Sequence, residues 1–229
     1  MTSSASTVRA PGPNVGEGVG AAFDAQALLL ARERSIEATR RIAAAIRPGM
    51  TEQQAVQIAD GVFADLGFER LWHPTHIRFG RNTLKLYKEA SELEVVLGPR
   101  DLFFIDIGPV WGGHEGDYGD TFVVGDDPTM LDIARAAREI FADVAERWRA
   151  GANGQALYRY AERAAVSRGY VLNLGAPGHR LGDFPHAVHK AGKLAAADFS
   201  PSSGLWVLEI QIRHPELPIG AFYEDLLLG

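Results

Sequence analysis

Cysteine is absent from the 229 residues of this chain. Its absence excludes disulfide bonds, thiolate nucleophiles and zinc sites built on cysteine, although it does not distinguish a reducing from an oxidising compartment. Any metal ion that the chain binds must therefore be held by oxygen atoms and imidazole nitrogens.

Long apolar runs and an excess of basic residues are also missing. The longest apolar run near the start, Ala27 to Ala31, is far shorter than the roughly 20 residues of a membrane-spanning helix, and no signal-peptide pattern precedes it. Acidic residues outnumber basic ones by 29 to 23, and the net charge is −6 without any run of lysines and arginines. We therefore expect a cytoplasmic protein with neither a nucleic-acid nor a membrane partner.

The remaining composition is typical of a globular protein. Hydrophobic residues make up 46% of the chain and charged residues 23%, so it can bury a sizeable core. Residues 1–22 are small, polar and rich in glycine and proline, which predicts a flexible N-terminal tail. Residues 23–229 are expected to fold as a single domain.

Helical patterns occur twice along the chain. Apolar spacing from Phe23 predicts a long helix that ends at Pro48, and Thr51 fits a capping box that opens a second helix ending near Gly67. An ungapped offset of 102 residues brings the same types of cap and stop residue into register again over residues 127–170. Either the chain is an internal duplication, with a site between two facing halves, or two helical hairpins share boundary residues by chance.

Segments rich in phenylalanine, isoleucine, valine and leucine follow each helical pair and are bounded by glycine or proline, which predicts strands. They are residues 76–80, 102–109, 119–124, 171–174, 205–212 and 221–228. The predicted fold class is therefore α+β with a sheet at its core.

Three acidic residues lie inside these apolar strands: Asp106, Glu209 and Glu224. An ionised carboxylate among aliphatic neighbours costs on the order of several kcal/mol unless it is paired. Arg213 is the only basic residue near these strands, and it can satisfy one acid at most. The three together favour a bound cation, whereas each one alone could equally be a hydrogen-bonded carboxylate in the core.

A second argument for a divalent cation comes from two aspartates in the predicted hairpin of residues 102–124. Residues 102–109 and 117–124 flank a glycine-rich turn and predict a hairpin, in which a turn near Trp111 or Gly112 would place Asp106 and Asp117 about 5 Å apart on one face. Bridging by a cation would convert their repulsion into coordination.

The imidazole for such a site is expected from the glycine-rich residues 175–186. His179 follows a turn rich in glycine and proline, where the backbone can bend sharply and present a side chain into a cleft. His186, seven residues later, could support the site or donate a hydrogen bond to a substrate. Taken alone, a histidine at the position of His179 is also typical of an ordinary turn.

The ordered set resembles the pita-bread metallopeptidases, which include methionine aminopeptidase, Xaa-Pro aminopeptidase, prolidase and creatinase. The resemblance covers about residues 24–229. The matching positions are Asp106 in IDIG, Asp117 before YGDTF, His179 in GHRLG, His186, Glu209 in LEIQI and Glu224 in YEDLLL.

The resemblance implies a pita-bread α+β fold in which two pseudo-two-fold helix-helix-strand halves surround a curved antiparallel sheet, with residues 23–229 as the catalytic domain. It implies two divalent ions (Mn, Fe, Co or Zn) and a bridging hydroxide that attacks an amide carbonyl. The implied metal ligands are Asp106, Asp117, His179, Glu209 and Glu224. Glu209 would also move a proton, and His186 would act in catalysis and substrate binding.

One departure from the family concerns its histidine five residues after the asparagine of a G-x-N segment, which is Tyr87 here, after Asn82. A tyrosine can donate a hydrogen bond but titrates near pH 10, so Tyr87 would be a weaker catalytic acid than histidine. His73 and His76 lie nearby, and either could substitute for it or lie on the surface. We place His76 with the substrate-binding residues.

Three functions are therefore compatible with the sequence. The first is an aminopeptidase of the Xaa-Pro or methionine type that acts on a small peptide. The second is a creatinase-like hydrolase or lyase that acts on a small nitrogen- or sulfur-containing acid, and the third is a non-catalytic binding module. Neither the metal, nor the substrate, nor a homodimeric state is decided by the sequence.

Overall fold

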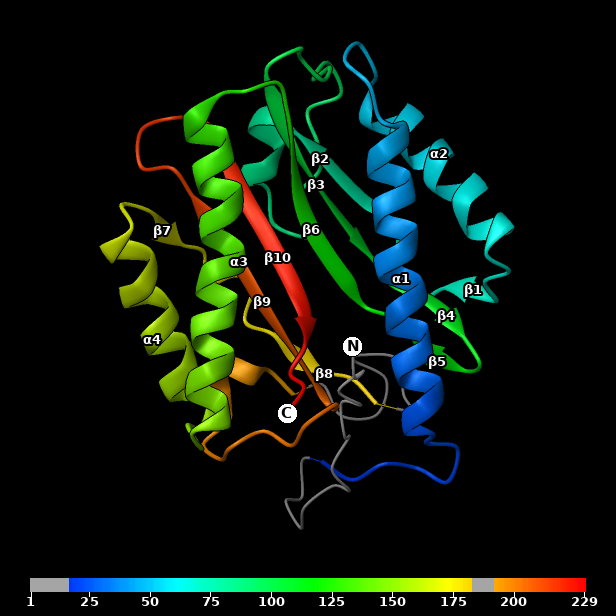
Figure 1. Cartoon of the computed structure of the whole chain (residues 1–229), viewed down its shortest axis with the longest axis vertical. Coiled ribbons are helices and arrows are strands. Elements are labelled where there is room, and N and C mark those ends of the chain that lie inside the picture. Colours follow the sequence, from blue (N-terminus) through cyan, green and yellow to red (C-terminus); the bar gives the residue numbers. More distant parts are fainter. Residues whose placement is uncertain (1–16, 183–191) are drawn as a thin grey trace, which may run out of the picture.

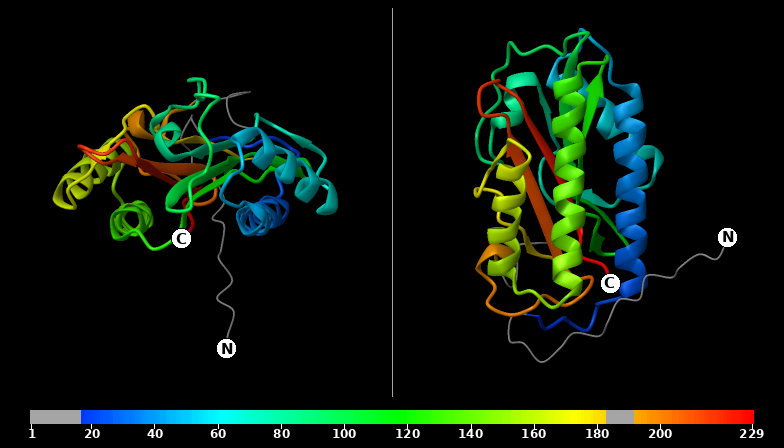
Figure 2. Two further views of the ribbon diagram at one scale, coloured as in Figure 1. Left: turned by 90° about the horizontal axis from the view of Figure 1, so that it is seen from above. Right: turned by 60° about the vertical axis from the view of Figure 1, so that its left-hand side comes forward.

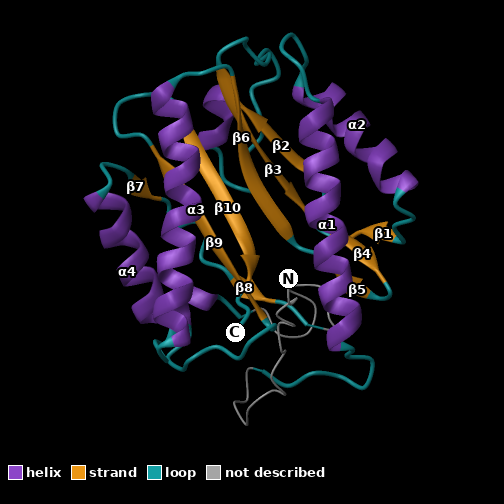
Figure 3. Ribbon diagram, viewed as in Figure 1, coloured by secondary structure: helices purple, strands orange, loops and turns teal. Residues whose placement is uncertain are grey.

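The computed structural model describes residues 17–182 and 192–229 and contains a curved sheet flanked by helices (Figures 1 and 3). The helices are α1 (Ala25–Ala45), α2 (Glu52–Asp65), α3 (Pro128–Arg149) and α4 (Gly154–Ser167), with 3-10 helices η1 (Gly80–Leu84) and η2 (Leu194–Ala196). The strands are β1 (Arg70–Leu71), β2 (His76–Phe79), β3 (Asp101–Ile107), β4 (Pro109–Trp111), β5 (His114–Glu115), β6 (Tyr118–Val124), β7 (Val171–Leu172), β8 (His179–Arg180), β9 (Trp206–Arg213) and β10 (Gly220–Leu226). The predicted α+β class is confirmed.

The two helical pairs have matching boundaries, as a duplication predicts. Helices α2 and α4 begin 102 residues apart and end 102 residues apart. Thr51 caps α2 with both bonds of a capping box, and Asn153 caps α4 through its side-chain oxygen. Each helix is followed by a glycine with positive φ, Gly67 at 66° and Gly169 at 81°, a conformation that favours glycine. The same local signals therefore start and stop both helices.

The main sheet is antiparallel and joins the two halves of the chain. Its strand order is β2-β3-β6-β10-β9-β7, with β8 also paired to β9, while β1, β4 and β5 form a small second sheet. Strands β2, β3 and β6 come from the first half, and β7, β9 and β10 from the second. The halves therefore meet where β6 pairs with β10, in the middle of the sheet (Figure 1).

The predicted hairpin is present, but its predicted register is wrong. Two consecutive glycines with positive φ, Gly112 at 57° and Gly113 at 73°, form the turn and are flanked by the short strands β4 and β5. The turn centre is displaced toward the C-terminus, so Asp106 pairs with Gly119 rather than with Asp117. Asp117 lies just before β6 and approaches Asp106 diagonally.

Helices α1 and α3 cover one face of the main sheet, as Figure 2 shows. Ile105 and Ile107 of β3 are buried against α1 and α2, and Ile210 of β9 is buried against α3 and α4. Because strand side chains alternate between faces, the intervening Asp106 and Glu209 point away from the helices. The face opposite α1 and α3 therefore carries Asp106 and Glu209.

Two ion pairs on the helix side cross between the halves. In the first, Arg32 of α1 donates from Nε and Nη2 to the two oxygens of Asp225 on β10, each at 2.5 Å. In the second, Arg138 of α3 donates from Nε to Asp120 Oδ1 on β6 at 2.8 Å. Asp120 thus faces helix α3 and not the opposite face of the sheet.

Residues before α1 also contact the folded chain. The Glu17 carboxylate is buried and accepts hydrogen bonds from Trp206 Nε1 at 2.8 Å and from the Ser202 amide at 2.6 Å. These contacts begin before the predicted end of the tail at residue 22. Within the described residues, no helix combines the length and the apolar character that a bilayer span requires.

The shared caps give a prediction about stability. Thr51→Ala and Asn153→Ala should each lower the free energy of unfolding by about 1 kcal/mol, because each removes the acceptor for an orphan amide at a helix start. Urea unfolding of the purified variants measures this change. Gln57→Ala, at an exposed position within α2, is the matched control and should be nearly neutral. Unchanged stability of both cap variants would contradict the role of these residues.

Candidate metal centre

One row of paired residues crosses five strands of the main sheet. From β2 to β9 the directly paired residues are His76, Asp106, Gly119, Glu224 and Glu209. Directly paired residues of antiparallel strands point to the same face, so the three carboxylates lie together on the face opposite α1 and α3. The register of the sheet therefore brings Asp106 beside Glu209 and Glu224, which follow it by more than 100 residues in the sequence.

Gly119 provides the space in the middle of this row. A Cβ atom at this position would lie 2.6 Å from the Phe222 ring and 3.0 Å from Glu224 Oε1. Any larger residue would therefore displace the neighbouring side chains. The missing side chain leaves a gap between the carboxylates of Asp106 and Glu224.

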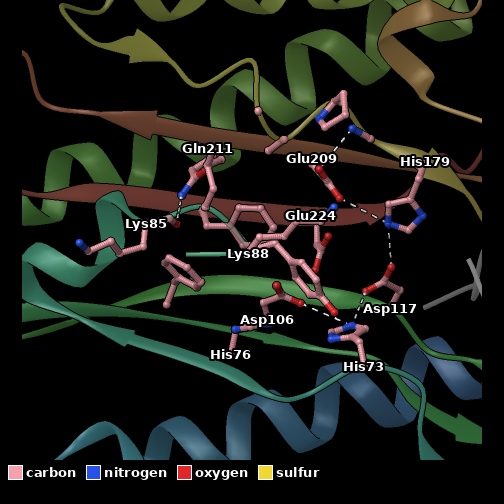
Figure 4. A pocket seen from close by; sticks show the side chains of 18 of the residues that line it. His73, His76, Lys85, Lys88, Asp106, Asp117, His179, Glu209, Gln211 and Glu224 are labelled. Atoms are coloured by element: carbon pink, nitrogen blue, oxygen red, sulfur yellow. Dashed lines mark hydrogen bonds and ion pairs between the residues drawn. The ribbon is translucent and has the colours of Figure 1, made fainter. Parts of the chain in front are cut away.

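Asp117 lies in the next row on the same face and is 2% exposed. Its two oxygens face different histidines: Oδ2 is 3.0 Å from His179 Nε2, and Oδ1 is 3.7 Å from His73 Nε2. His179 is held on β8 opposite Val207, and its Nε2 is also 3.4 Å from Glu209 Oε1. Asp117 therefore lies between two imidazoles (Figure 4).

For His73 the sequence left two possibilities open, substitution for the family histidine at Tyr87 or a position on the surface. It lies in the loop between β1 and β2, is 6% exposed, and its Nε2 is 3.7 Å from Asp106 Oδ1 as well as from Asp117 Oδ1. The suggested surface position is therefore wrong for His73. The one signal in the sequence for this close approach is the glycine at position 108, because a Cβ atom there would lie 2.5 Å from the His73 ring.

The ligand atoms form two groups that share Asp117. The first consists of His73, Asp106 and Asp117 and the second of Asp117, His179 and Glu224, and within each group one nitrogen or oxygen per residue lies within 4.8 Å of the others. These groups contain four of the five ligands expected from the resemblance. The fifth, Glu209, lies beside His179.

The electrostatics of this cluster indicate a need for positive charge. Burial raises the pKa of Glu224 well above its usual range, and the charges of Asp117, Asp106 and Glu209 raise it further. Burial likewise raises the pKa of Glu209, although His179 opposes the shift. Among the described residues, the buried Glu224 Oε1 has no hydrogen-bond partner. Carboxylate oxygens and imidazole nitrogens in this arrangement fit divalent cations.

The cluster opens into a cavity of about 510 Å³ that also contains the other predicted site residues. Tyr87 and His76 line it, with their ring centroids 4.6 Å apart in an edge-on arrangement. Tyr87 is 49% exposed, whereas burial lowers the pKa of His76 and favours its neutral form. His186 lies outside the described residues.

The metal-free protein should show an unusual titration of His73. Burial opposes its protonation, but contact with Asp117 and the charges of Asp106 and Asp117 raise the pKa of His73 to about 9. Since the unfolded value is about 6.5, the protonated ring stabilises the metal-free fold fully below that pH, and this contribution disappears as the pH rises through about 9. NMR titration of chelator-treated protein, with His73→Gln for assignment, measures it. Loss of this proton near pH 6.5 would contradict the geometry.

Comparison with known proteins finds one relative by sequence and several by structure. A Mycoplasma pneumoniae protein, provisionally named a Xaa-Pro aminopeptidase, is 30% identical over 117 residues, which are 49% of this chain and 32% of that protein. The Thermotoga maritima X-Pro aminopeptidase structure has a TM-score of 0.70 at 19% identity and covers 88% of this chain and 60% of its own. The structure of zinc-substituted Escherichia coli aminopeptidase P in complex with product has a TM-score of 0.73 at 23% identity. The match covers 89% of this chain and 53% of that structure's chain.

A third structure matches nearly over its whole length. The Thermotoga maritima methionine aminopeptidase has a TM-score of 0.71 at 16% identity and covers 89% of this chain and 95% of its own. The chain thus spans about a third of the Mycoplasma relative, which matches it in sequence, and little more than half of aminopeptidase P. The model of metallopeptidase family M24 matches residues 26–225. The chain therefore belongs to metallopeptidase family M24 and has the pita-bread fold of that family.

Proposed function

We propose that the chain is a dinuclear metal-dependent aminopeptidase that removes a residue from the amino end of a short peptide. The observation that carries this proposal is Asp117, whose two oxygens face His73 and His179 from opposite sides. A carboxylate in that position can bridge two ions, one in each ligand group. Family membership supports a metal-dependent hydrolase as the class of enzyme.

The proposed ligands are the five expected from the resemblance, namely Asp106, Asp117, His179, Glu209 and Glu224. Four carboxylates carry a charge of −4, which two divalent ions balance. Bound ions would lower the pKa of a water between them and polarise the substrate carbonyl. Manganese is the first metal to test, because the donor set consists mostly of hard oxygen atoms, with iron, cobalt and zinc as alternatives.

Glu209 is the proposed proton carrier. It is at the edge of the ligand cluster, and the Gly178 amide donates to its Oε2 at 3.2 Å. Because burial raises the pKa of its carboxyl, Glu209 can take a proton from the attacking water and pass it to the leaving amine. The hydroxyl of Tyr158 donates to the backbone carbonyl of Glu209 at 3.1 Å, which holds this part of β9 in place.

Tyr87 and His76 are proposed to contact the substrate from the other wall. Tyr87 can donate a hydrogen bond to a substrate carbonyl, but burial raises the pKa of its hydroxyl, so it is unsuited to release its proton. His76 Nε2 is buried and has no hydrogen-bond partner among the described residues. It is therefore available to a polar group of the substrate.

A second candidate is a creatinase-like hydrolase or lyase for a small nitrogen- or sulfur-containing acid. Among the described residues, four basic side chains also line the cavity that holds the carboxylates: Arg78, Lys85, Lys88 and Lys193. Lys88 and Lys193 are exposed, and a substrate carboxylate would complement their charge. This observation favours substrates that carry a free acid group close to the scissile bond.

Reconstitution tests the proposed function. Chelator-treated protein reloaded with Mn²⁺ should bind two equivalents and cleave Met-, Ala- or Xaa-Pro peptides, as measured by elemental analysis and mass spectrometry. Asp117→Asn should weaken the binding of both ions by at least about 100-fold, because loss of an outer-shell partner alone costs about 10- to 100-fold. Asp60→Asn, at an exposed position in α2, is the charge-matched control and should leave binding and cleavage unchanged.

The outcomes separate the candidates. Folded, metal-loaded protein that converts a small acid but none of these peptides would favour the second candidate. Binding of less than one equivalent by folded wild-type protein would contradict both and would support a non-catalytic module.

A further inference from the structure

His73 lies outside the ligand set that the resemblance implies, yet it belongs to one of the two ligand groups. We propose that His73 is a sixth protein ligand, which binds through Nε2 the ion shared by Asp106 and Asp117. This inference rests on the proposed metal pair. It gives each ion one imidazole, His73 on one side of Asp117 and His179 on the other.

The position of the His73 ring supports coordination. Its Nε2 lies at the same separation, 3.7 Å, from Asp106 Oδ1 and from Asp117 Oδ1. Two ligand atoms that are each bound to one ion at about 2.1 Å lie roughly 3 to 3.7 Å apart, depending on the bond angle. The ring nitrogen thus faces the gap between the two carboxylates.

The orientation of the ring places Nδ1 against a backbone carbonyl. His73 Nδ1 is 2.9 Å from the Pro74 carbonyl, to which it can donate, so Nε2 carries the lone pair in the neutral ring. His179 has the same arrangement, with Nδ1 3.3 Å from the Arg180 carbonyl. Metal-binding histidines usually donate their second ring nitrogen to a carbonyl or carboxylate in this way.

The local backbone is built around this ring. The Trp72 amide donates to the Gly108 carbonyl at 2.8 Å, which brings the loop before β2 against the end of β3. Gly108 has no Cβ atom, and one would lie 2.5 Å from the ring of His73. Pro74 restricts His73 to extended conformations. These three features together hold the imidazole at the acidic cluster.

The neighbouring His76 is a suitable control because it shares most of this environment. Its ring is stacked on that of His73, with centroids 6.2 Å apart. Its Nδ1, however, is 3.4 Å from Nη2 of Arg78, a permanent cation, and His76 belongs to neither ligand group. Removing His76 should therefore affect substrate contacts and leave the ions in place.

The test compares His73→Ala, His73→Gln and His76→Ala in full-length, metal-reconstituted protein. Titration with Co²⁺ or Mn²⁺ gives the affinity of each ion, and X-ray absorption of the loaded protein counts the imidazoles. The wild-type pair should have two imidazoles. His73→Ala should have one, with one ion unchanged and the other weakened by at least about 100-fold. His76→Ala should match wild type in both measurements.

The results distinguish failure of this inference from failure of the proposed function. Wild-type protein that binds no metal would overturn both. Wild-type protein with two ions and a single imidazole would overturn only the role of His73, and this count does not depend on whether a variant folds. Unchanged affinities in the folded His73 variants, with activity lost, would likewise overturn coordination and indicate a proton donor.

Discussion

Repulsion between carboxylates is the constraint on which the site depends. Asp106, Asp117, Glu209 and Glu224 project from the same face of one sheet into a common gap, and burial together with neighbouring negative charge raises the pKa of Glu224 well above its usual range. Within the described residues the imidazoles of His73 and His179 face these acids. In the proposed site, divalent cations would supply the positive charge that two imidazoles cannot.

The duplicated architecture places this cluster of acids at the junction between the two halves. The halves meet at β6 and β10, so the gap lies over the junction, while α1 and α3 pack on the opposite face. On that face the neighbouring acids Asp120 and Asp225 are each paired with an arginine of a helix, Arg138 and Arg32. On the face covered by helices, arginines of the chain therefore neutralise the acids. On the other face, the proposed metal ions would balance the negative charge.

Local signals made most of the fold predictable. The caps at Thr51 and Asn153, the glycine stops and the apolar strand patterns are each contained within a few residues, and the structure has them where they were expected. The proposed ligands were chosen from the acids in apolar strands together with the family resemblance. The strand partner of Asp106 was predicted wrongly, because the turn centre lies one residue further along the chain than expected. The contact of His73 with the acids was not predicted, because it arises from a loop that packs across the end of β3.

The central claim is that two ions lie on opposite sides of Asp117. Anomalous diffraction from crystals of the Mn²⁺-loaded protein tests it most directly, because it locates each ion independently of any activity. The account predicts two anomalous peaks, one between Asp117 and His73 and the other between Asp117 and His179. A single peak, or two peaks on the same side of Asp117, would contradict it.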